Sequence, residues 1–300
     1  MTNPHTRPVF VGIDGSAAAL TAARWAAHEA ARRNLDLVLL AAVTAPNGPG
    51  RGQERYREVL HRAAWSHLDS AAAEVCFHVP GLQVQRSVED GTAATVLADA
   101  SKRAALLVLG RSGHSGFAGL LIGSIALAAA ARAHCPVAVV GGSAAARPEA
   151  PVVVGVEGSA ESDAALGYAF EEANARGVRL VAVHAWSDVV LDPRLMLLLD
   201  WVTVEKSAHA FLADRLAGWT GKFPDVDVRT SVVRDRPASA LVERSTNAQL
   251  LVVGSRGRGG VAGLLLGSVS RAVLPHAHSP VVLVPTGLDA ASDSDGGAAG

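Results

Sequence analysis

The sequence predicts an α/β protein of two tandem, doubly wound domains, each built on a parallel sheet of about five strands. Two observations carry this prediction. Short apolar runs alternate with amphipathic segments along the chain, and the second half repeats the order of signals found in the first. For example, Asp14 is matched by Glu157, and Gly110 by Gly254. Because strand–helix–strand connections are right-handed, each half is expected to be a Rossmann-like sheet covered by helices on both faces.

Each copy opens with a short apolar strand, at residues 9–13 and 152–156. The strand ends in an acid, a glycine and a serine, which read "IDGS" in the first copy and "VEGS" in the second. Ser16 and Ser159 have the side chains that cap helix N-termini, so a helix is expected to follow each of them.

The later elements also come in the same order in both halves. The first helix is expected to end at Asn34, and its counterpart at Gly177, since both residue types readily adopt the left-handed conformation. Nine elements then follow in each half: a buried strand, a variable loop, a long helix, an alternating strand, a short helix, an apolar strand, a glycine segment, a helix and a last strand. The expected bounds are 35–43 and 178–186 for the buried strands, 44–53 and 187–193 for the loops, and 92–102 and 237–246 for the short helices.

Composition divides the chain into four parts. We expect a first domain at residues 1–143, a linker at 144–150, a second domain at 151–286 and a disordered tail at 287–300. The linker region, "GGSAAARPEA", is small and flexible, and the tail has few apolar residues to bury.

Charge and cysteine content exclude several classes of protein. The 27 Lys and Arg nearly balance the 28 Asp and Glu, so nothing in the net charge of -1 favours nucleic acid or an anionic membrane. There are two cysteines, no CxxC pair and no secretory signal, which favours a cytoplasmic location. The uncharged stretch at 115–131 is broken by glycines, so it is interpreted as a loop that enters a buried helix.

The glycine segments, "GRSGHSGFAGLLIGS" at 110–124 and "GSRGRGGVAGLLLGS" at 254–268, each follow a strand. Ligands of open parallel sheets bind at such strand ends, and glycine backbone N–H groups can converge on a phosphate. Gly123 permits close approach, and Ser124 is expected at the helix N-cap, where it offers a hydroxyl and an N–H. Asp14 is placed to accept hydrogen bonds from ribose hydroxyls. A lone glycine segment could mark a tight turn, but two copies with equal spacing favour a binding function.

These features resemble the universal stress protein family over residues 8–286. The resemblance rests on "GIDGS" at the first strand, on "CPV" and "SPV" before the last strands, and on a spacing typical of the family's ATP-binding signature. That spacing is made by Gly110, Gly113, Gly123 and Ser124, and again by Gly254, Gly257, Gly267 and Ser268. It implies ATP-binding regulators of stress survival and growth that pair through their last strands, so the two halves are expected to pair with each other.

The resemblance also implies a site in each domain for one ATP, with Mg²⁺ on the phosphates and no metal-ligating protein residue. Asp14 would bind ribose, and the backbones of Ala42 and Ala185 would face adenine. The full expected set is Ile13, Asp14, Gly15, Ser16, Ala42, Gly110, Arg111, Gly113, His114, Gly123, Ser124, Ile125, Val156, Glu157, Gly158, Ser159, Ala185, Gly254, Arg256, Gly257, Arg258, Gly267, Ser268 and Val269.

The second copy departs from the family pattern at Glu157, where the family has Asp. The added methylene is expected to cost the ribose contact, so the second site is expected to be the weaker one. Arg256 and Arg258 lie within the second segment, where the first has Arg111 and His114. Either of the two arginines could reach a phosphate, which a guanidinium suits, or could be a solvated loop residue.

Three other functions stay open. One is a slow ATPase or another nucleotide-processing enzyme, for which His114 is the candidate base, although Arg258 stands at its counterpart position. The others are a sensor of AMP or cyclic AMP, and a nucleotide-free scaffold. No catalytic residue is expected. The expected partners are an adenine nucleotide and an unidentified regulatory protein, with further homodimerisation of whole chains left open.

Overall fold

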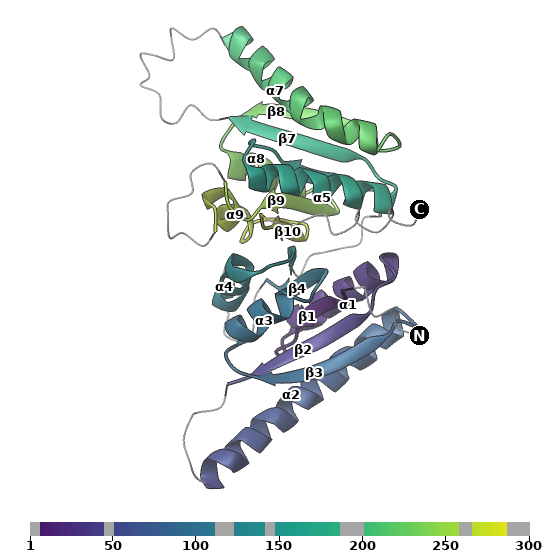
Figure 1. Cartoon of the computed structure of the whole chain (residues 1–300), viewed down its shortest axis with the longest axis vertical. Coiled ribbons are helices and arrows are strands. Elements are labelled where there is room, and N and C mark those ends of the chain that lie inside the picture. The colour runs from purple at the N-terminus through teal and green to yellow at the C-terminus, as the bar shows by residue number, and fades with distance from the viewer. Residues whose placement is uncertain are drawn as a thin grey trace, which may run out of the picture.

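The fold is known from a computed structural model, which describes residues 7–44, 51–111, 123–141, 148–186, 201–257 and 266–286. Strands and helices alternate through both halves of the described chain (Figure 1). The first half consists of β1 (Val9–Gly12), α1 (Ala17–Arg32), β2 (Leu37–Val43), α2 (Arg51–His78), β3 (Val84–Asp90), α3 (Ala93–Ser101), β4 (Leu106–Gly110), α4 (Ser124–Arg132) and β5 (Val137–Val140). The second consists of β6 (Val152–Gly155), α5 (Ala160–Arg176), β7 (Leu180–Trp186), α7 (Trp201–Lys222), β8 (Val228–Arg234), α8 (Pro237–Ser245), β9 (Leu250–Gly254), α9 (Ser268–Val273) and β10 (Val281–Val284).

The strands form one continuous ten-stranded sheet, in the order β3-β2-β1-β4-β5-β10-β9-β6-β7-β8. Within each half all neighbouring strands are parallel. The halves meet where β5 and β10 pair antiparallel, with Val139 opposite Val281 and Val137 opposite Leu283. The predicted doubly wound α/β class with two tandem units is confirmed, and the two five-stranded sheets are joined through their last strands.

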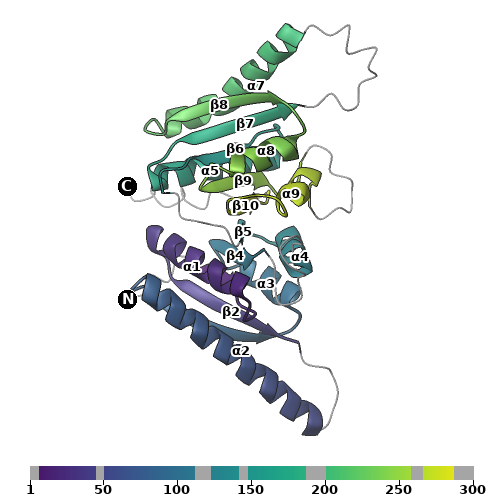
Figure 2. The same cartoon turned by 180° about the vertical axis from the view of Figure 1, so that it is seen from behind.

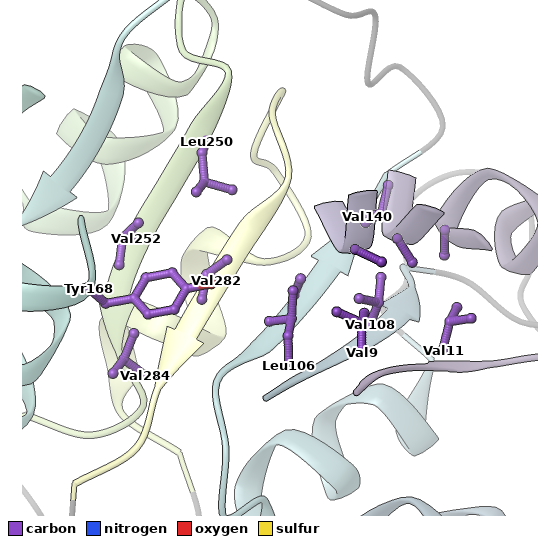
Figure 3. Packing of buried hydrophobic residues seen from close by; sticks show 14 of the residues in the cluster. Val9, Val11, Leu106, Val108, Val140, Tyr168, Leu250, Val252, Val282 and Val284 are labelled. Carbon is purple, nitrogen blue, oxygen red and sulfur yellow. The ribbon is translucent and has the colours of Figure 1, made fainter. Parts of the chain in front are cut away.

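Helices cover both faces of this sheet (Figures 1 and 2). One face packs against α1, α2, α5 and α7, and the other against α3, α4, α8 and α9. Each face has one apolar core that continues across the β5–β10 joint, as Figure 3 shows for Val140 of the first half and Val282 of the second. Burial of this shared apolar surface therefore stabilises the two halves together.

The first helix of each half is bounded by the residues that the sequence indicates. The hydroxyl of Ser16 accepts a hydrogen bond from the N–H of Ala19 at 3.1 Å, and Ser159 caps α5 in the same way. Asn34, just after α1, has a φ of 52°, and Gly177 at the end of α5 has a φ of 63°. Both helices therefore end in a left-handed residue, as predicted.

Several boundaries differ from the sequence prediction by one or more residues, including the starts of β2 at Leu37 and of β7 at Leu180. The first strands end at Gly12 and Gly155, one residue before the expected ends. Gly123 is the N-cap of α4, so Ser124 is its first helical residue and not the cap that was predicted. Helix α2 begins at Arg51, inside the predicted loop 44–53. The second predicted loop, residues 144–147 of the linker and the tail at 287–300 lie outside the described residues.

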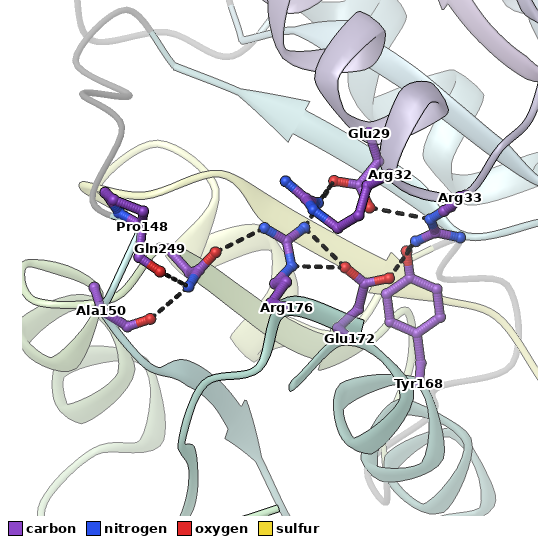
Figure 4. Close-up of polar contacts among 9 residues, drawn as sticks. All are labelled: Glu29, Arg32, Arg33, Pro148, Ala150, Tyr168, Glu172, Arg176 and Gln249. Carbon is purple, nitrogen blue, oxygen red and sulfur yellow. Dashed lines mark hydrogen bonds and ion pairs between the residues drawn. The ribbon is translucent and has the colours of Figure 1, made fainter. Parts of the chain in front are cut away.

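A buried ionic network joins α1 to α5 across the joint (Figure 4). Glu29 accepts hydrogen bonds from Arg33 at 3.0 Å and from Arg176 of the other half at 2.7 Å. Arg33 also pairs with Glu172 and donates to the Tyr168 hydroxyl at 2.5 Å. Each of the two carboxylates is therefore shared between arginines of both halves.

Gln249, which precedes β9, extends the network to the chain that enters the second half. Its side-chain oxygen accepts from Arg176 at 2.8 Å, while its amide nitrogen donates to the carbonyls of Pro148 and Ala150 at 3.1 and 2.6 Å (Figure 4). The segment that precedes β6 is therefore connected, through Gln249, to the ion pairs between α1 and α5.

Candidate functional site

Two cavities of about 270 Å³ each lie at the carboxyl ends of the strands, one in each half. In both, the walls come from the turn after the half's first strand, the end of its fourth strand, and the start of the helix after the glycine segment. This place lies between β1 and β4 in one half and between β6 and β9 in the other, where the order of the strands reverses. Open parallel sheets bind ligands at this reversal point.

The first cavity has an apolar wall and one ionisable group, Asp14, among the described residues. Its lining consists of Gly12, Ile13, Asp14, Ser16, Ala19, Leu40, Ala42, Ala93, Val96, Leu97, Leu109, Gly110, Gly123, Ser124, Ile125 and Ala126. Asp14 is exposed, and its Oδ1 accepts a hydrogen bond from the N–H of Ser16 at 2.9 Å.

The turn after Asp14 requires a glycine. Gly15 has a φ of 82°, in the left-handed region that favours glycine. A Cβ at Gly15 would also lie 2.7 Å from the ring of His67, so α2 covers this turn. The acid is therefore held at the rim by a tight turn that packs against His67 of α2.

The start of α4 offers backbone donors to the first cavity. The N–H of Gly123 is already used, because it donates to the carbonyl of Arg111 at 2.9 Å. Ser124, Ile125 and Ala126 line the cavity from the first turn of α4, and the N-cap provides no side-chain acceptor. N–H groups in a first turn have no intrahelical acceptor, and such groups are the donors that bind anions at helix N-termini.

Gly110 and Gly254 are explained by packing as well as by the cavity. A Cβ at Gly110 would lie 2.8 Å from the backbone carbonyl carbon of Ala18, and one at Gly254 would lie 2.9 Å from the Cβ of Glu161. Ala18 and Glu161 occupy matching positions in the first turns of α1 and α5. These two glycines let the first helix of each half approach its fourth strand.

The second cavity carries more polar groups than the first. Ser162 stands where the first half has Ala19, and Ser270 where it has Ala126. Its lining consists of Gly155, Val156, Glu157, Ser162, Val183, Ala185, Pro237, Leu241, Val253, Gly254, Arg256, Gly257, Leu266, Gly267, Ser268, Val269 and Ser270.

The carboxylate of Glu157 contacts the second glycine segment as well as its own turn, whereas the carboxylate of Asp14 accepts a hydrogen bond within its own turn. A Cβ on Gly257 would overlap the Glu157 carboxylate, so the two are in direct contact. The Ser159 hydroxyl donates to Oε1 of Glu157 at 2.9 Å. The longer acid therefore reaches from the end of β6 to the segment that follows the neighbouring strand β9.

Arg111 lies differently from the expectation that it would belong to the nucleotide site. Its guanidinium donates to the carbonyl of Ala277, in the other half, at 2.7 Å and lies against Gly141. It is not among the residues that line the first cavity. Its counterpart in the second half is Ser255, whose side chain cannot make the same contact.

Most of the expected site residues line a cavity, and the rest have other positions. Gly15, Gly158 and Ser159 belong to the turns beside the cavities, while Gly113, His114 and Arg258 lie outside the described residues. Glycine spacing gave no sign of the apolar wall formed by α3, with Ala93, Val96 and Leu97, or by α8. The signal for this wall was the apolar face at the start of each of these helices.

Two further observations concern the described part of the chain. It contains no helix that is long and apolar enough to cross a membrane. Nor does it contain a group of three or more His, Cys, Asp or Glu side chains arranged to hold a metal ion.

Known proteins match this chain along nearly its whole length. The universal stress protein family matches twice, at residues 5–141 and 150–285. A universal stress protein of Mycobacterium tuberculosis is 42% identical over 289 residues, which cover 92% of this chain and 96% of the relative. A second one from the same organism is 40% identical over 293 residues, covering 93% and 97%.

Solved structures share the fold. A crystal structure of a universal stress protein from Archaeoglobus fulgidus aligns with a TM-score of 0.70 at 20% identity, covering 94% of this chain and all (100%) of the other. A functionally unknown protein from Pseudomonas aeruginosa aligns with a TM-score of 0.60 at 17% identity, covering 94% and 93%. With two copies of the family's domain in tandem, the chain belongs to the universal stress protein family.

Proposed function

We propose that this protein is a cytoplasmic regulator that binds adenine nucleotides, ATP with Mg²⁺ on its phosphates, at the two cavities. The observation that carries the proposal is the composition of the first cavity. It combines an apolar slot, an acid at the rim and the first-turn backbone N–H groups of a nine-residue helix, which have no intrahelical acceptor. A nucleotide needs each of these, for its base, its ribose and its phosphates respectively.

Each part of the nucleotide has a proposed partner. The base would lie against Ala42 and the apolar side chains of α3, such as Leu97, and its ribose hydroxyls would donate to the Asp14 carboxylate. The phosphates would accept hydrogen bonds from the N–H groups of Ser124 and Ile125 and gain from the α4 dipole. Bound Mg²⁺ would neutralise part of the phosphate charge. The second cavity would bind ATP more weakly than the first.

Binding without turnover is part of the proposal. Among the described residues that line the cavities, the ionisable side chains are Asp14 in the first, and Glu157 and Arg256 in the second. Asp14 and Glu157 are each engaged by their own turn, and Arg256 is a cation, so none is placed as a general base beside phosphate. Nucleotide binding would instead stabilise the folded state and change the surface offered to a protein partner.

Isothermal titration calorimetry of the full chain with ATP, ADP, AMP and cyclic AMP tests the proposal. Asp14→Ala should weaken ATP binding at the first site by about tenfold to a hundredfold, because charged hydrogen bonds to ribose are lost. Asp99→Ala serves as a control, since Asp99 is an exposed acid on α3 that pairs with Lys102 outside the cavity. No nucleotide binding by the wild type, or equal losses in the two variants, would contradict the proposal.

A further inference from the structure

The acids at the two strand ends lie differently, and this difference bears on which ligands each cavity accepts. Asp14 is exposed and bonded to the N–H of Ser16 in its own turn. Glu157 is half-buried, and its carboxylate rests on Gly257, where it also accepts the Ser159 hydroxyl at 2.9 Å. The second cavity therefore has a negative charge placed on its own glycine segment.

The backbone of Glu157 is also held by hydrogen bonds. Its N–H donates to the Ser162 hydroxyl at 2.9 Å, and the N–H of Gly158 donates to the same oxygen at 3.3 Å. Ser162 is buried at the start of α5, and the first half has Ala19 at the matching position. The turn that carries Glu157 is thus held by contacts that Ala19 cannot make for the turn of Asp14.

Arg256 brings the opposite charge into the second cavity, but it is an exposed residue, and solvent and salt screen its attraction for a ligand. The carboxylate of Glu157 has a defined position against Gly257. A phosphate that approached the glycine backbone would meet this like charge within a few ångströms, where the repulsion in a partly buried site is strong. An uncharged nucleoside would not meet that repulsion.

We infer that Glu157 makes the second cavity selective for an uncharged purine nucleoside over a nucleoside triphosphate, whereas the first cavity accepts the phosphates. This inference rests on the proposed function, because it assumes that both cavities hold adenosine-type ligands. Glu157 acts here as a specificity-determining residue. One chain would then bind two different ligands, a nucleotide in the first half and the corresponding nucleoside, without phosphates, in the second.

The test uses the full-length chain with Ala42→Phe, which fills the first cavity and leaves the second to be titrated alone. Adenosine and ATP are titrated in EDTA, so that no metal ion neutralises the phosphates. Adenosine should bind at least about tenfold more tightly than ATP. Glu157→Gln should raise ATP affinity by about tenfold or more and leave adenosine affinity within about twofold. Glu157→Asp should also favour ATP, because the shorter acid withdraws from Gly257.

Glu161→Gln is the matched control, since Glu161 is an acid in the first turn of α5 that does not line the cavity. It should change ATP affinity far less than Glu157→Gln does. If the Ala42→Phe variant does not fold, crystals of the wild-type chain are soaked separately in adenosine and in ATP. The electron density in each cavity then shows which ligand is bound there.

The two proposals fail in different ways. If neither ligand binds either cavity, the proposed function is wrong, and the inference falls with it. If ATP binds both cavities equally tightly and Glu157→Gln changes nothing, the inference alone is overturned. Adenosine in the second cavity and ATP in the first, with the selectivity removed by Glu157→Gln, is the result that supports both.

Discussion

Arg33 of α1 and Glu172 of α5 form an ion pair between the two halves, with side-chain exposures of 20% and 6%. Removing Glu172 leaves the buried Arg33 and Arg176 with the single carboxylate of Glu29 between them, so part of their charge is buried without compensation. We expect Glu172→Ala to lower the free energy of unfolding by about 3–5 kcal/mol, measured by chemical denaturation. Glu74→Ala, which breaks the more exposed Arg24–Glu74 pair between α1 and α2, should cost less than about 1 kcal/mol. Equal losses would show that the joint depends little on these ions.

The same network should make stability depend on pH in the acid range. Burial alone would raise the pKa of Glu29, but the charges of Arg176, Arg33 and Arg32 overcome it and hold the pKa at about 2, below the usual 4.5. A carboxyl whose pKa is lowered on folding contributes stability above pH 4.5 and loses it as the pH falls towards 2. The contribution at neutral pH is about 3 kcal/mol.

Glu172 works in the opposite sense, because burial and the charge of Glu29 raise its pKa. We therefore expect Glu29→Gln to flatten the fall in stability between pH 4.5 and pH 2, measured by thermal unfolding across that range. Glu172→Gln should leave the fall at least as steep. Identical acid profiles for Glu29→Gln and the wild type would rule out this origin.

The packing of Gly110 predicts a loss of stability that does not involve a ligand. Gly110→Ala places a methyl group against the backbone of Ala18, and overpacking of this kind costs about 1–3 kcal/mol. Gly218→Ala in α7 is the control, because a Cβ there has no neighbour within 4 Å. In a helix interior this change should stabilise by about 0.5–1 kcal/mol. Opposite signs of the two changes, measured in urea without nucleotide, would support the packing role.

The contact of Arg111 with Ala277 predicts that this arginine stabilises the joint and not a bound phosphate. Arg111→Gln should lower the free energy of unfolding by about 1.5–3 kcal/mol, which is typical of a hydrogen bond to a charged group. ATP affinity should stay within about twofold of the wild type. A large loss of ATP affinity with unchanged stability would show that Arg111 contacts the bound nucleotide.

The two cysteines should react with thiol reagents at very different rates. Burial raises the pKa of Cys135 to about 12, whereas Cys76 is exposed on α2. Because the thiolate is the reactive form, Cys135 should react only after unfolding. Titration of the native protein with a chromogenic disulfide should release about one equivalent quickly and a second one in denaturant. Two rapid equivalents would contradict the burial of Cys135.

The order of the elements and most of their bounds could be predicted because local signals determine them. Ser16 and Asn34 bound α1 through their own hydroxyl and backbone preferences, which depend on few other residues. The N-cap of α4 was mispredicted because Ser124 and Gly123 are adjacent and both residue types cap helices. Propensity alone could not rank the two.

Contacts between the halves were harder to predict from sequence. Glu29 and Arg33 are buried by the approach of α5, which the sequence around α1 does not indicate. Arg111 was expected among the nucleotide-binding residues because it lies in the glycine segment, yet its side chain donates a hydrogen bond to the carbonyl of Ala277. The contact of Glu157 with Gly257 was equally hidden, since it depends on which way a long side chain points.

The antiparallel pairing of β5 with β10 has a consequence for how the two halves can change. In a dimer of identical subunits every substitution appears twice, so both binding cavities must tolerate it. Here the two halves belong to one polypeptide, so the residues of each cavity can change separately while the β5–β10 pairing is kept. Asp14 in place of Glu157, and Arg111 in place of Ser255, are differences that a homodimer could not keep.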